Sequence, residues 1–585
     1  MRTKTVHKVR IVGPLEEEKE IVGTIHEIGS LHIDKVEEGQ LEQETSQAGV
    51  EEVSNLLLHL SFIKEVSTIY NPPTIETLPE LHRVLAETHS FLDTHKDFFT
   101  TKDTKRQKKH RRLDVLNERV KQLQRLPKEF MGKNDLLLFS SEEVLDDIPE
   151  EGVNHIRRKR HYYSITATGL AKARVAKAFH QSPGSKIDLS FVKSSPSEAL
   201  QTMRKEIKDL ESQINSIMNH INSYAEDITV KFSYLYATLK NHYDRLTISN
   251  NFAKSETLVT IEGFAEPEDA LKIAKKLPSC NVYTEEVEDA PTKLGNQGAY
   301  KSFEPITKMF DTPKYKQFDP TTVVSLFYPL FFGIMLSDIG YGLFLLALMP
   351  LLPRFIETDV KKYQDILGLS ALSTILFGVL FGSFFGDLVP LEPLLLDPFQ
   401  DSFTILLGSL VLGLIHMNLG VAIAFYQHIK NDSSGFETAK DVLPLPLIEV
   451  GVLSLVYSFV ALGSVMLLIA LSLLVAKKGA LGILDVTDYL GTWFSYARLL
   501  ALSLATAGIA LAVNIISAQV SSLGIMGIII SIFILILGHI FNFALNTLGT
   551  AINAARLHYV EFFGLFFDGG GESFEPFKIK VPTTT

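Results

Sequence analysis

The sequence predicts a mostly α-helical protein that has a cytosolic arm, residues 1–320, and a polytopic membrane domain, residues 321–585. Two observations predict this fold class. Hydropathy changes near Pro320, because the residues before it are charged with short apolar repeats and nearly every later stretch is apolar. Within the apolar part lie two arginines, Arg498 and Arg556. A charged side chain is expensive inside a membrane, so both arginines indicate a partner or a task there.

The composition excludes several classes of protein. The net charge of -11 arises mainly before Pro320 and basic runs are few, so we expect no nucleic-acid partner. The single cysteine, Cys280, excludes a disulfide framework and a cysteine-rich metal site. We find no phosphate-binding G-x-x-x-x-G-K-[ST] loop, no zinc-ligand pattern and no Ser/His/Asp pattern. We therefore expect no cofactor, no metal and no catalytic site in this chain.

The sequence of the arm predicts small α/β lobes around long helices. Alternating apolar and polar residues predict strands at 5–13, 31–36, 136–139 and 161–168, and a short α/β unit is expected at 258–267. Helices are expected over about 41–70 and on to Leu126, where Pro127 ends the second one. The basic run Lys102–Arg112 could bind lipid or nucleic acid, but we interpret it as a solvated helix face. No signal-peptide core precedes the arm, which indicates a cytosolic location.

A heptad seam is the clearest pattern in the arm. Apolar residues step alternately by three and four over about four heptads. They are Leu200, Met203, Ile207, Leu210, Ile214, Ile217, Ile221, Tyr224 and Ile228. A shorter seam upstream consists of Leu113, Leu116, Val120 and Leu123. Because both seams lie in one chain with a compact domain between them, the sequence favours an antiparallel coiled coil over a parallel homodimer.

Six apolar stretches follow the arm. They lie at roughly 322–352, 363–388, 403–427, 443–476, 484–520 and 524–563. Basic residues between and after them are Arg354, Lys361, Lys362, Lys430, Lys440, Lys477, Lys478, Lys578 and Lys580. The positive-inside rule puts each of these in the cytosol only if the first and fourth stretches cross twice. The sequence therefore predicts about eight membrane helices, with both termini in the cytosol.

The predicted membrane helices have unequal lengths. The first two average about 15 residues, or about 22 Å, so protein must shield them, and Asp338 lies at the turn between them. The last two reach roughly 55–60 Å each. Helices of that length must tilt strongly or lie partly along the interface.

Polar residues recur on the last helix at helical spacing. They are His539, Asn542, Asn546, Gly549, Asn553 and Arg556. Steps of three and four place them on one face of an otherwise apolar helix. Asn and His can hold helices together in a membrane, but that role does not explain a terminal arginine. We interpret this polar stripe as the wall of a hydrated path.

The preceding helix carries small residues beside Arg498. These are Ala501, Ala505, Gly508 and Ala512. Small residues allow another helix to approach closely, so this face suits a partner helix that slides past the arginine. The other polar residues in the spans are interpreted as packing or boundary residues: Asp387, His416, Asn418 and Glu449.

At this point the whole chain resembles one family, the a subunit (I in prokaryotes) of rotary V-type and A-type ATPases. The most specific motifs lie in the membrane part: FEPITKMFDTPKYKQFDPTTVVSLFYPLFFGIMLSDIGYG (303–342), GLIHMNLG (413–420), SYARLLALSLA (495–505) and ARLHYVEFFGLFFDGGGESFEPF (555–577). KVRIVGP (8–14), GFAEPED (263–269) and APTKLGN (290–296) also match. The chain is short with minimal loops, which favours the prokaryotic form.

The resemblance implies a membrane stator subunit without a catalytic site. Arg498 and Arg556 occupy the positions of the two half-channel arginines. The residues expected to line the half-channels are then His539, Asn542, Asn546, Asn553, Glu561, Ser495 and Asp338. The implied partners are a rotating proteolipid ring, peripheral-stalk subunits, the central-stalk subunit that caps the ring, and membrane lipid.

Some positions depart from the commoner pattern of that family. This chain has Thr506 and Gly508 where many members carry His-x-Gln, and Asn553 where many carry histidine. Two other classes of function remain. A secondary transporter predicts internal repeats, and we see none between the halves of the membrane domain. A purely structural scaffold leaves both arginines unexplained.

Overall fold

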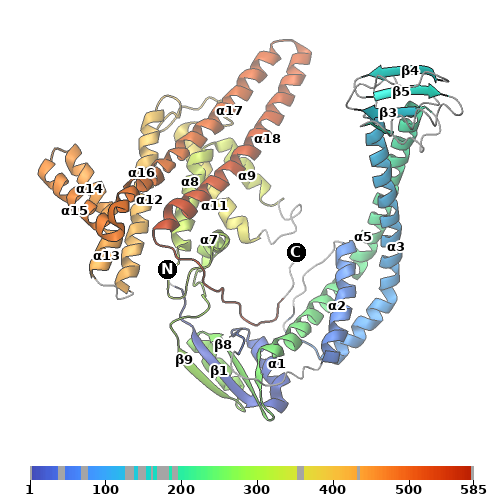
Figure 1. Cartoon of the computed structure of the whole chain (residues 1–585), viewed down its shortest axis with the longest axis horizontal. Helices are drawn as coiled ribbons and strands as arrows, with labels where there is room; N and C mark the ends of the chain where they lie inside the picture. Colours follow the sequence, from blue (N-terminus) through green and yellow to red (C-terminus); the bar gives the residue numbers. More distant parts are fainter. Residues whose placement is uncertain are drawn as a thin grey trace. The chain divides into compact units, whose positions relative to one another are not determined.

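The chain forms two compact units in the computed structural model (Figure 1). The structure describes residues 3–36, 47–67, 75, 77–124, 137–141, 153–159, 162–167, 184–186, 195–351, 361–430 and 435–580. One unit comprises Met1–Thr45 with Ile248–Thr585, and the other Ser46–Thr247. The predicted boundary at residue 320 lies inside the first unit, which holds an N-terminal lobe together with the apolar helices.

Three long helices form the body of the second unit. They are α2 (Gln47–Ser67), α3 (Leu81–Gln124) and α5 (Pro196–Ile248). Helices α3 and α5 run antiparallel, because later residues of α3 contact earlier residues of α5. His95 Nδ1 lies 2.8 Å from the Tyr224 hydroxyl, whereas Arg112 Nε donates to Glu206 Oε1 at 3.1 Å. The predicted antiparallel arrangement of the two seams agrees with these contacts.

Seam residues of the coiled coil are buried. On α3 these include Leu116 and Leu123, and on α5 Ile214 and Ile221. A wider core near the start of α3 joins residues of all three helices, among them Leu60, Phe91, Phe99, Phe232 and Leu235. The heptad pattern therefore identified the contact between the helices.

A small antiparallel sheet belongs to the same unit. Its strands are β3 (Leu137–Ser141), β4 (Val153–Lys159), β5 (Tyr162–Ala167) and β6 (Gly184–Lys186), in the order β4-β5-β3-β6. The strands predicted at 136–139 and 161–168 overlap β3 and β5. Leu136, His161 and Thr168, like 41–46 and the helix stop at Pro127, lie outside the described residues.

The N-terminal lobe is an α/β sandwich. Its strands are β1 (His7–Pro14), β2 (His32–Ile33), β7 (Ala253–Lys254), β8 (Leu258–Ala265) and β9 (Asn281–Glu286), ordered β2-β8-β1-β9 with β7 beside β8. Helices α1 (Glu18–Ile28) and α6 (Pro267–Lys276) cover the sheet through a core that includes Ile11, Ile25 and Ile273. The predicted strand at 5–13 and the α/β unit expected at 258–267 thus contribute the hydrogen-bonded strands β1 and β8.

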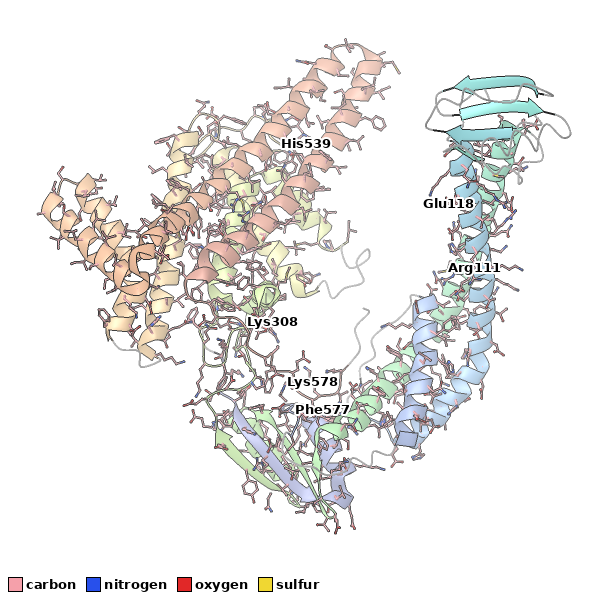
Figure 2. All side chains as sticks on the ribbon, viewed as in Figure 1. Arg111, Glu118, Lys308, His539, Phe577 and Lys578 are labelled. Atoms are coloured by element: carbon pink, nitrogen blue, oxygen red, sulfur yellow. The ribbon has the colours of Figure 1, made fainter. Side chains whose placement is uncertain are left out.

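The C-terminal segment lies on this lobe, and Figure 2 shows Phe577 and Lys578 beside it. The amide of Phe577 donates to the Leu31 carbonyl at 2.7 Å, and its ring centroid lies 4.3 Å from that of His26. The amide of Glu575 donates to His32 Nδ1 at 3.0 Å. The segment that follows the last apolar helix therefore ends on the lobe that precedes the first one.

The apolar part is helical. Its helices are α7 (Glu304–Phe310), α8 (Thr321–Leu336), α9 (Ile339–Leu348), α11 (Lys361–Phe381), α12 (Ser402–Lys430), α13 (Gly435–Val442), α14 (Pro444–Val456), α15 (Val460–Lys478), α16 (Leu484–Phe494), α17 (Arg498–Ser521) and α18 (Ile525–Arg556). Among the described residues, 5 helices are long and apolar enough to cross a membrane. Helices α8, α9 and α14 are apolar but shorter.

The first apolar stretch folds back on itself. The turn at Asp338 lies beside Gly378, near the end of α11. Gly333 before the turn and Gly342 after it both lie against residues 371–375. Along the chain, the contacts with α11 move from residue 373 to Gly378 and then back to residues 371–375. The chain therefore reverses direction at Asp338, and α8 and α9 form a helical hairpin.

The other two helix pairs are also antiparallel. In α14–α15, Gly451 lies against Gly463 and Leu467, beyond a break at Ser458. In α17–α18, Ser517 bonds Ser531 at 2.7 Å, while Asn542 bonds the Thr506 carbonyl at 3.1 Å. The last two helices therefore lie side by side along their length (Figure 1).

Candidate functional site

Two polar clusters lie along the α17–α18 pair. The arginine cluster consists of Ser495, Arg498 and Glu561, where α17 begins and α18 ends. The amide cluster consists of Tyr341, Asp387, Asn514, His539 and Asn542, farther along both helices toward their connection. Figure 2 marks His539 on α18.

The arginine cluster contains an ion pair. Arg498 Nη1 lies 3.7 Å from Glu561 Oε1, and the two side chains are 22% and 2% exposed. Ser495 lies near the Glu561 carboxylate, and its hydroxyl donates to the Gly491 carbonyl at 3.1 Å. Within the described part of the chain, Arg498 Nη1 and Glu561 Oε2 have no hydrogen-bond partner. A buried charge without its full set of partners is costly, so this site has capacity for another ligand.

Irregular backbone places both members of the ion pair. A 3-10 turn, Ser495–Ala497, joins α16 to α17 immediately before Arg498. A π-helical turn, Leu557–Phe562, follows Arg556 and carries Glu561. Such turns are frequent at functional sites because they rotate side chains out of the regular helical pattern. Helical periodicity alone therefore could not place Glu561 opposite Arg498.

Arg556 lies on the exposed surface, although its positive charge still acts on the Glu561 carboxylate. Its side chain is exposed, like those of Ile552 and Val560 on either side of it. The small-residue face of α17 is uncovered in the same way: Ala501, Ala505 and Ala512 are exposed. Apart from its chain neighbours and the backbone of its own helix, no described atom lies within 4 Å of the position that a Cβ on Gly508 would occupy. Both helices thus present an unfilled surface next to an arginine.

A cavity of about 270 Å³ reaches Glu561. Its polar lining residues are Asp441, Lys477, Asp485, Asp488, Tyr489, Thr492 and Glu561. Sequence reasoning missed the acidic wall of this cavity, although the signal was present: residues 485, 488 and 492 recur at helical spacing on α16. Asp441 and Lys477 lie at helix ends and pair at 3.3 Å. The cavity therefore extends from Glu561 toward the ends of the helices.

Polar residues that the sequence suggested were packing or boundary residues make hydrogen bonds between the helices. Asn418 donates to Glu449 at 2.6 Å, and the Tyr489 hydroxyl donates to the same carboxylate. His416 bonds the Tyr496 hydroxyl at 2.8 Å, and its ring centroid lies 5.0 Å from that of His558. Both rings are fully buried, and among the described residues neither Nε2 has a partner.

The amide cluster is a continuous hydrogen-bonded chain. Asn514 Nδ2 donates to Asp387 Oδ1 at 2.7 Å and to the Phe385 carbonyl at 2.9 Å. Asn514 Oδ1 lies 2.9 Å from His539 Nε2, and His539 Nδ1 lies 2.9 Å from the Tyr341 hydroxyl. Asn542 Nδ2 donates to that hydroxyl at 2.7 Å. The chain links α9, α17 and α18.

The bonds fix the proton positions in this chain. Both hydrogens of the Asn514 amide group are donated, so its oxygen must accept the hydrogen of His539 Nε2. A neutral imidazole then accepts at Nδ1, and the Tyr341 hydroxyl is the donor. The tyrosine hydroxyl still accepts from Asn542, so donors and acceptors alternate along the chain.

Asp338 lies behind the amide cluster rather than in its chain of bonds. It is 1% exposed and accepts bonds from the Tyr341 and Phe385 amides at 3.0 Å each. The Gly386 amide at 2.8 Å and the Ser383 hydroxyl at 2.6 Å also donate to it. Phe385 has a left-handed φ of 47, which an L-residue adopts only with such support. Asp338 therefore fixes the backbone on which the cluster depends.

The predicted polar stripe on α18 divides between burial and exposure. His539, Asn542 and Asn546 are buried, and the Asn546 amide donates to the Asn542 carbonyl at 3.1 Å. Asn553 is partly buried and donates to the Gly549 carbonyl at 2.8 Å. The stripe is thus not one uniform wall: its first part packs against α9 and α17, and its last part approaches the exposed surface at Arg556.

The chain is similar to known membrane subunits. Residues 31–371 match the model of a family described as "V-type ATPase 116kDa subunit family". The A-type ATP synthase subunit I of Methanocaldococcus jannaschii is 34% identical, over 68% of this chain and 66% of that protein. The subunit I of Pyrococcus horikoshii is 30% identical over 75% and 73%. That of Archaeoglobus fulgidus is 26% identical over 99% of both chains.

One solved structure is similar in part. It is the crystal structure of the cytoplasmic N-terminal domain of subunit I, homolog of subunit a, of V-ATPase. The match covers 48% of this chain and 99% of that one at 10% identity, with a TM-score of 0.26. A likeness at that score is too slight to identify a shared fold.

Proposed function

The chain belongs to the V-type ATPase 116 kDa subunit family, and from this premise we propose that it is the membrane stator subunit of a rotary ATP-driven ion pump or ATP synthase. It is a non-catalytic subunit, and family membership implies that it works with other subunits of an ATPase complex. Its task is to carry ions past a rotating proteolipid ring. The observation that carries the proposal is the buried Arg498–Glu561 pair beside an uncovered small-residue face.

Arg498 acts on the carboxylates of the ring. A ring carboxylate must be neutral to face lipid, because a bare charge there is costly. A guanidinium group cannot lose its proton, so it favours the ionised carboxylate and lowers its pKa. An ion leaves the ring where it meets Arg498 and is replaced when the carboxylate moves on. The side chains of Ala501 and Ala505 are small enough for a ring helix to pass.

The two clusters are the two half-channels. The acidic cavity next to Glu561 leads toward the cytosol, and Ser495 lies near Glu561 at its inner end. The amide cluster leads toward the opposite side, with His539, Asn542 and Asn546 as its lining and Asp338 as the residue that positions it. Asn553 continues that lining toward Arg556. The two arginines separate the half-channels and prevent a direct leak.

The helices cross the membrane eight times. Hairpins α8–α9 and α14–α15 supply the double crossings that the charge pattern requires, although α8, α9 and α14 are short. The C-terminal segment lies against the N-terminal lobe, with Phe577 on Leu31. An even number of crossings puts both on one side, and we assign that side to the cytosol. Residues 1–320 then form a cytosolic arm.

The arm connects the membrane domain to the rest of the complex. Its antiparallel coiled coil of α3 and α5 is a stiff element suited to binding peripheral-stalk subunits, and the ring-cap subunit is the expected neighbour on the ring side. A stator must resist the torque of the ring. The N-terminal lobe is connected to the membrane helices twice, through the linker before α8 and through the segment from Glu572 to Lys578. Two connections resist rotation better than one.

Replacement of Arg498 tests the proposal. In the complex reconstituted in vesicles, Arg498→Ala should assemble normally and lose ATP-driven ion uptake. Arg498→Lys should also fail, because lysine lacks the planar fork and is deprotonated more readily when desolvated. Arg111, an exposed arginine of the arm (Figure 2), supplies the matched control. Normal uptake by Arg498→Ala would contradict the proposal.

A further inference from the structure

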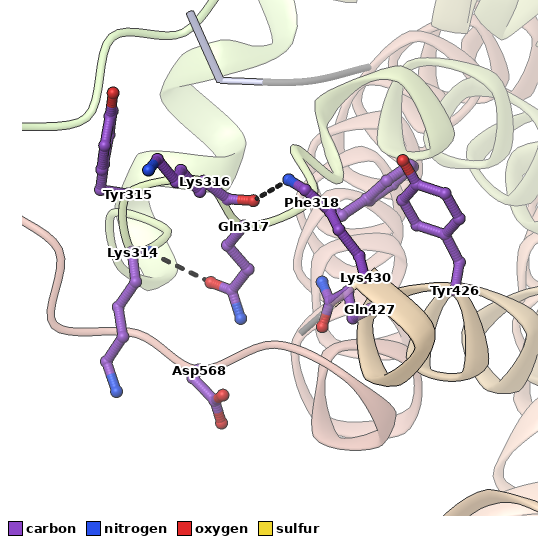
Figure 3. A pocket seen from close by; sticks show the side chains of 9 residues that line it. All are labelled: Lys314, Tyr315, Lys316, Gln317, Phe318, Tyr426, Gln427, Lys430 and Asp568. Atoms are coloured by element: carbon purple, nitrogen blue, oxygen red, sulfur yellow. Dashed lines mark hydrogen bonds between the residues drawn. The ribbon is translucent and has the colours of Figure 1, made fainter. Parts of the chain in front are cut away.

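A second cavity, separate from both clusters, lies at the last turn of α12. It measures about 160 Å³ (Figure 3). Its lining comes from three segments, the linker before α8, the end of α12 and the start of the C-terminal segment. The lining residues are Lys314, Tyr315, Lys316, Gln317, Phe318, Tyr426, Gln427, Lys430 and Asp568.

The charge of this cavity is positive. Three lysines face one carboxylate, that of Asp568. The Lys430 amino group donates to the Lys316 carbonyl at 2.9 Å and keeps two further hydrogens. Lys316 lies 3.8 Å from Glu286, a weak pairing at an exposed position. The Lys314 side chain is exposed.

An unpaired donor inside the cavity indicates the chemistry of its ligand. Gln427 Nε2 is buried and has no partner among the described residues. The neighbouring Gln317 Nε2 reaches the Phe566 carbonyl only at 3.5 Å. Leaving a buried donor unpaired costs about 1–3 kcal/mol. A ligand that accepts hydrogen bonds and carries negative charge would satisfy both the amides and the lysines, and a phosphate group does both.

The length of α12 places the cavity at the level of lipid headgroups. Its 29 residues span about 43 Å, whereas the hydrocarbon core is about 30 Å thick. The last turn therefore projects beyond the core. Phe425, Tyr426 and Ile429 are exposed around that turn, as expected for the aromatic belt at a membrane interface.

We propose that this cavity binds the phosphate group of an anionic membrane lipid. Gln427 and Lys430 donate to the phosphate, Lys314 adds charge, and the acyl chains lie along the exposed end of α12. Asp568 opposes a second negative charge, which favours a phosphodiester headgroup over a doubly charged phosphate. The bound lipid joins the linker, α12 and the C-terminal segment at the base of the membrane domain. Basic pockets between membrane helices are suited to such headgroups.

The test measures lipid retained by the full-length chain. Protein in nanodiscs of equimolar phosphatidylcholine and phosphatidylglycerol is released into detergent, and native mass spectrometry counts the bound lipids. Gln427→Leu should retain roughly tenfold less phosphatidylglycerol, since a hydrogen bond to a charged group is lost. Lys430→Gln should retain about fivefold less. Lys308→Gln, which removes the same charge from an exposed position outside the cavity, should retain as much as the parent.

Further variants and conditions separate the proposal from its alternatives. Gln427→Glu keeps the shape of the side chain and adds a repelling charge, so it should abolish selective retention even if the leucine variant folds poorly. Inorganic phosphate added to the released protein should leave the lipid bound. Displacement of the lipid by inorganic phosphate would mean a site for the free anion. Equal losses in Lys430→Gln and Lys308→Gln would mean general attraction to an anionic surface, and either result would overturn the proposal.

Discussion

In the amide cluster each polar side chain makes at least one hydrogen bond, whereas the arginine cluster leaves charged atoms without partners. His539 has both ring nitrogens engaged, at 2.9 Å each. Arg498 Nη1 and Glu561 Oε2 have no hydrogen-bond partner in the described residues. Yet both clusters lie on the same two helices, so their different bonding reflects different tasks.

The contrast teaches how one helix pair can serve two purposes. A continuous chain of hydrogen bonds defines its own geometry and can pass a proton by exchanging donor and acceptor roles at His539 and Tyr341. An incompletely bonded ion pair depends on a visiting charge to complete it. We infer that the amide cluster lines one half-channel, whereas the arginine cluster ends the other half-channel and also acts on the ring.

The largest effect is expected at Glu561. Glu561→Gln removes the charge that faces Arg498, and breaking a buried pair costs about 3–5 kcal/mol. Because Arg498 is 22% exposed, we expect the lower part of that range or less, about 2 kcal/mol of stability. Ion uptake in reconstituted vesicles should fall about a hundredfold, since the cytosolic cavity loses its inner carboxylate.

The conservative variant sharpens the assignment of Glu561. Glu561→Asp keeps the charge and should retain part of the uptake. If the glutamine variant pumped as well as the parent, Glu561 would be a packing residue and the cluster would reduce to Arg498.

A smaller effect is expected in the amide cluster. Tyr341→Phe deprives His539 and Asn542 of one partner each. We expect a loss of about 2 kcal/mol in stability and about tenfold slower uptake. Tyr328→Phe is the matched control, because within the described residues the hydroxyl of that buried tyrosine makes only a long bond of 3.4 Å, to the Ala551 carbonyl outside the cluster. Equal effects of the two variants would mean that the amide cluster is interhelical packing.

The smallest effect on transport is expected for a buried histidine of the arm. The His242 Nε2–H donates a hydrogen bond to the Pro79 carbonyl at 2.9 Å. Burial lowers the pKa of His242 from 6.5 to about 4. Between these values the unfolded chain binds a proton that the folded chain does not, so stability falls as pH decreases. The full effect is about 3 kcal/mol or less.

Hydrogen exchange of α5 in the full chain, measured at about pH 7 and about pH 5, should show this loss. His242→Gln should remove the pH dependence and leave ion uptake unchanged. A change in uptake would show that a bonded histidine affects transport wherever it lies, and the contrast between the clusters would lose its meaning.

Periodicity and charge predicted much of the fold. The heptad seam around Ile214 and Ile221 anticipated the antiparallel α3–α5 pair, because burial in a coiled coil repeats regularly. The loop charges anticipated two helical hairpins, because lysines such as Lys477 could otherwise not all lie on one side. The attachment of Phe577 to the lobe had no periodic signal, since it depends on a contact between the two ends of the chain.

The site was only partly predictable. Arg498, Arg556 and His539 stand out in apolar sequence, because a polar residue there is rare. Asp387 was interpreted as a boundary residue, although it is the end of the amide chain, since a bond to Asn514 cannot be inferred from spacing. The irregular turns that place Glu561 likewise depend on packing rather than on a local pattern.

Access from opposite sides tests the central claim most directly. In a Cys280→Ala background, Thr492→Cys in the acidic cavity and His539→Cys in the amide cluster are each exposed to a membrane-impermeant thiol reagent, added to one face of oriented vesicles. Thr492→Cys should react only from the cytosolic face and His539→Cys only from the opposite face, while Leu545→Cys and Leu548→Cys, on other faces of α18, stay protected. Reaction of both positions from the same face, or equal reaction all round α18, would contradict the assignment of two half-channels.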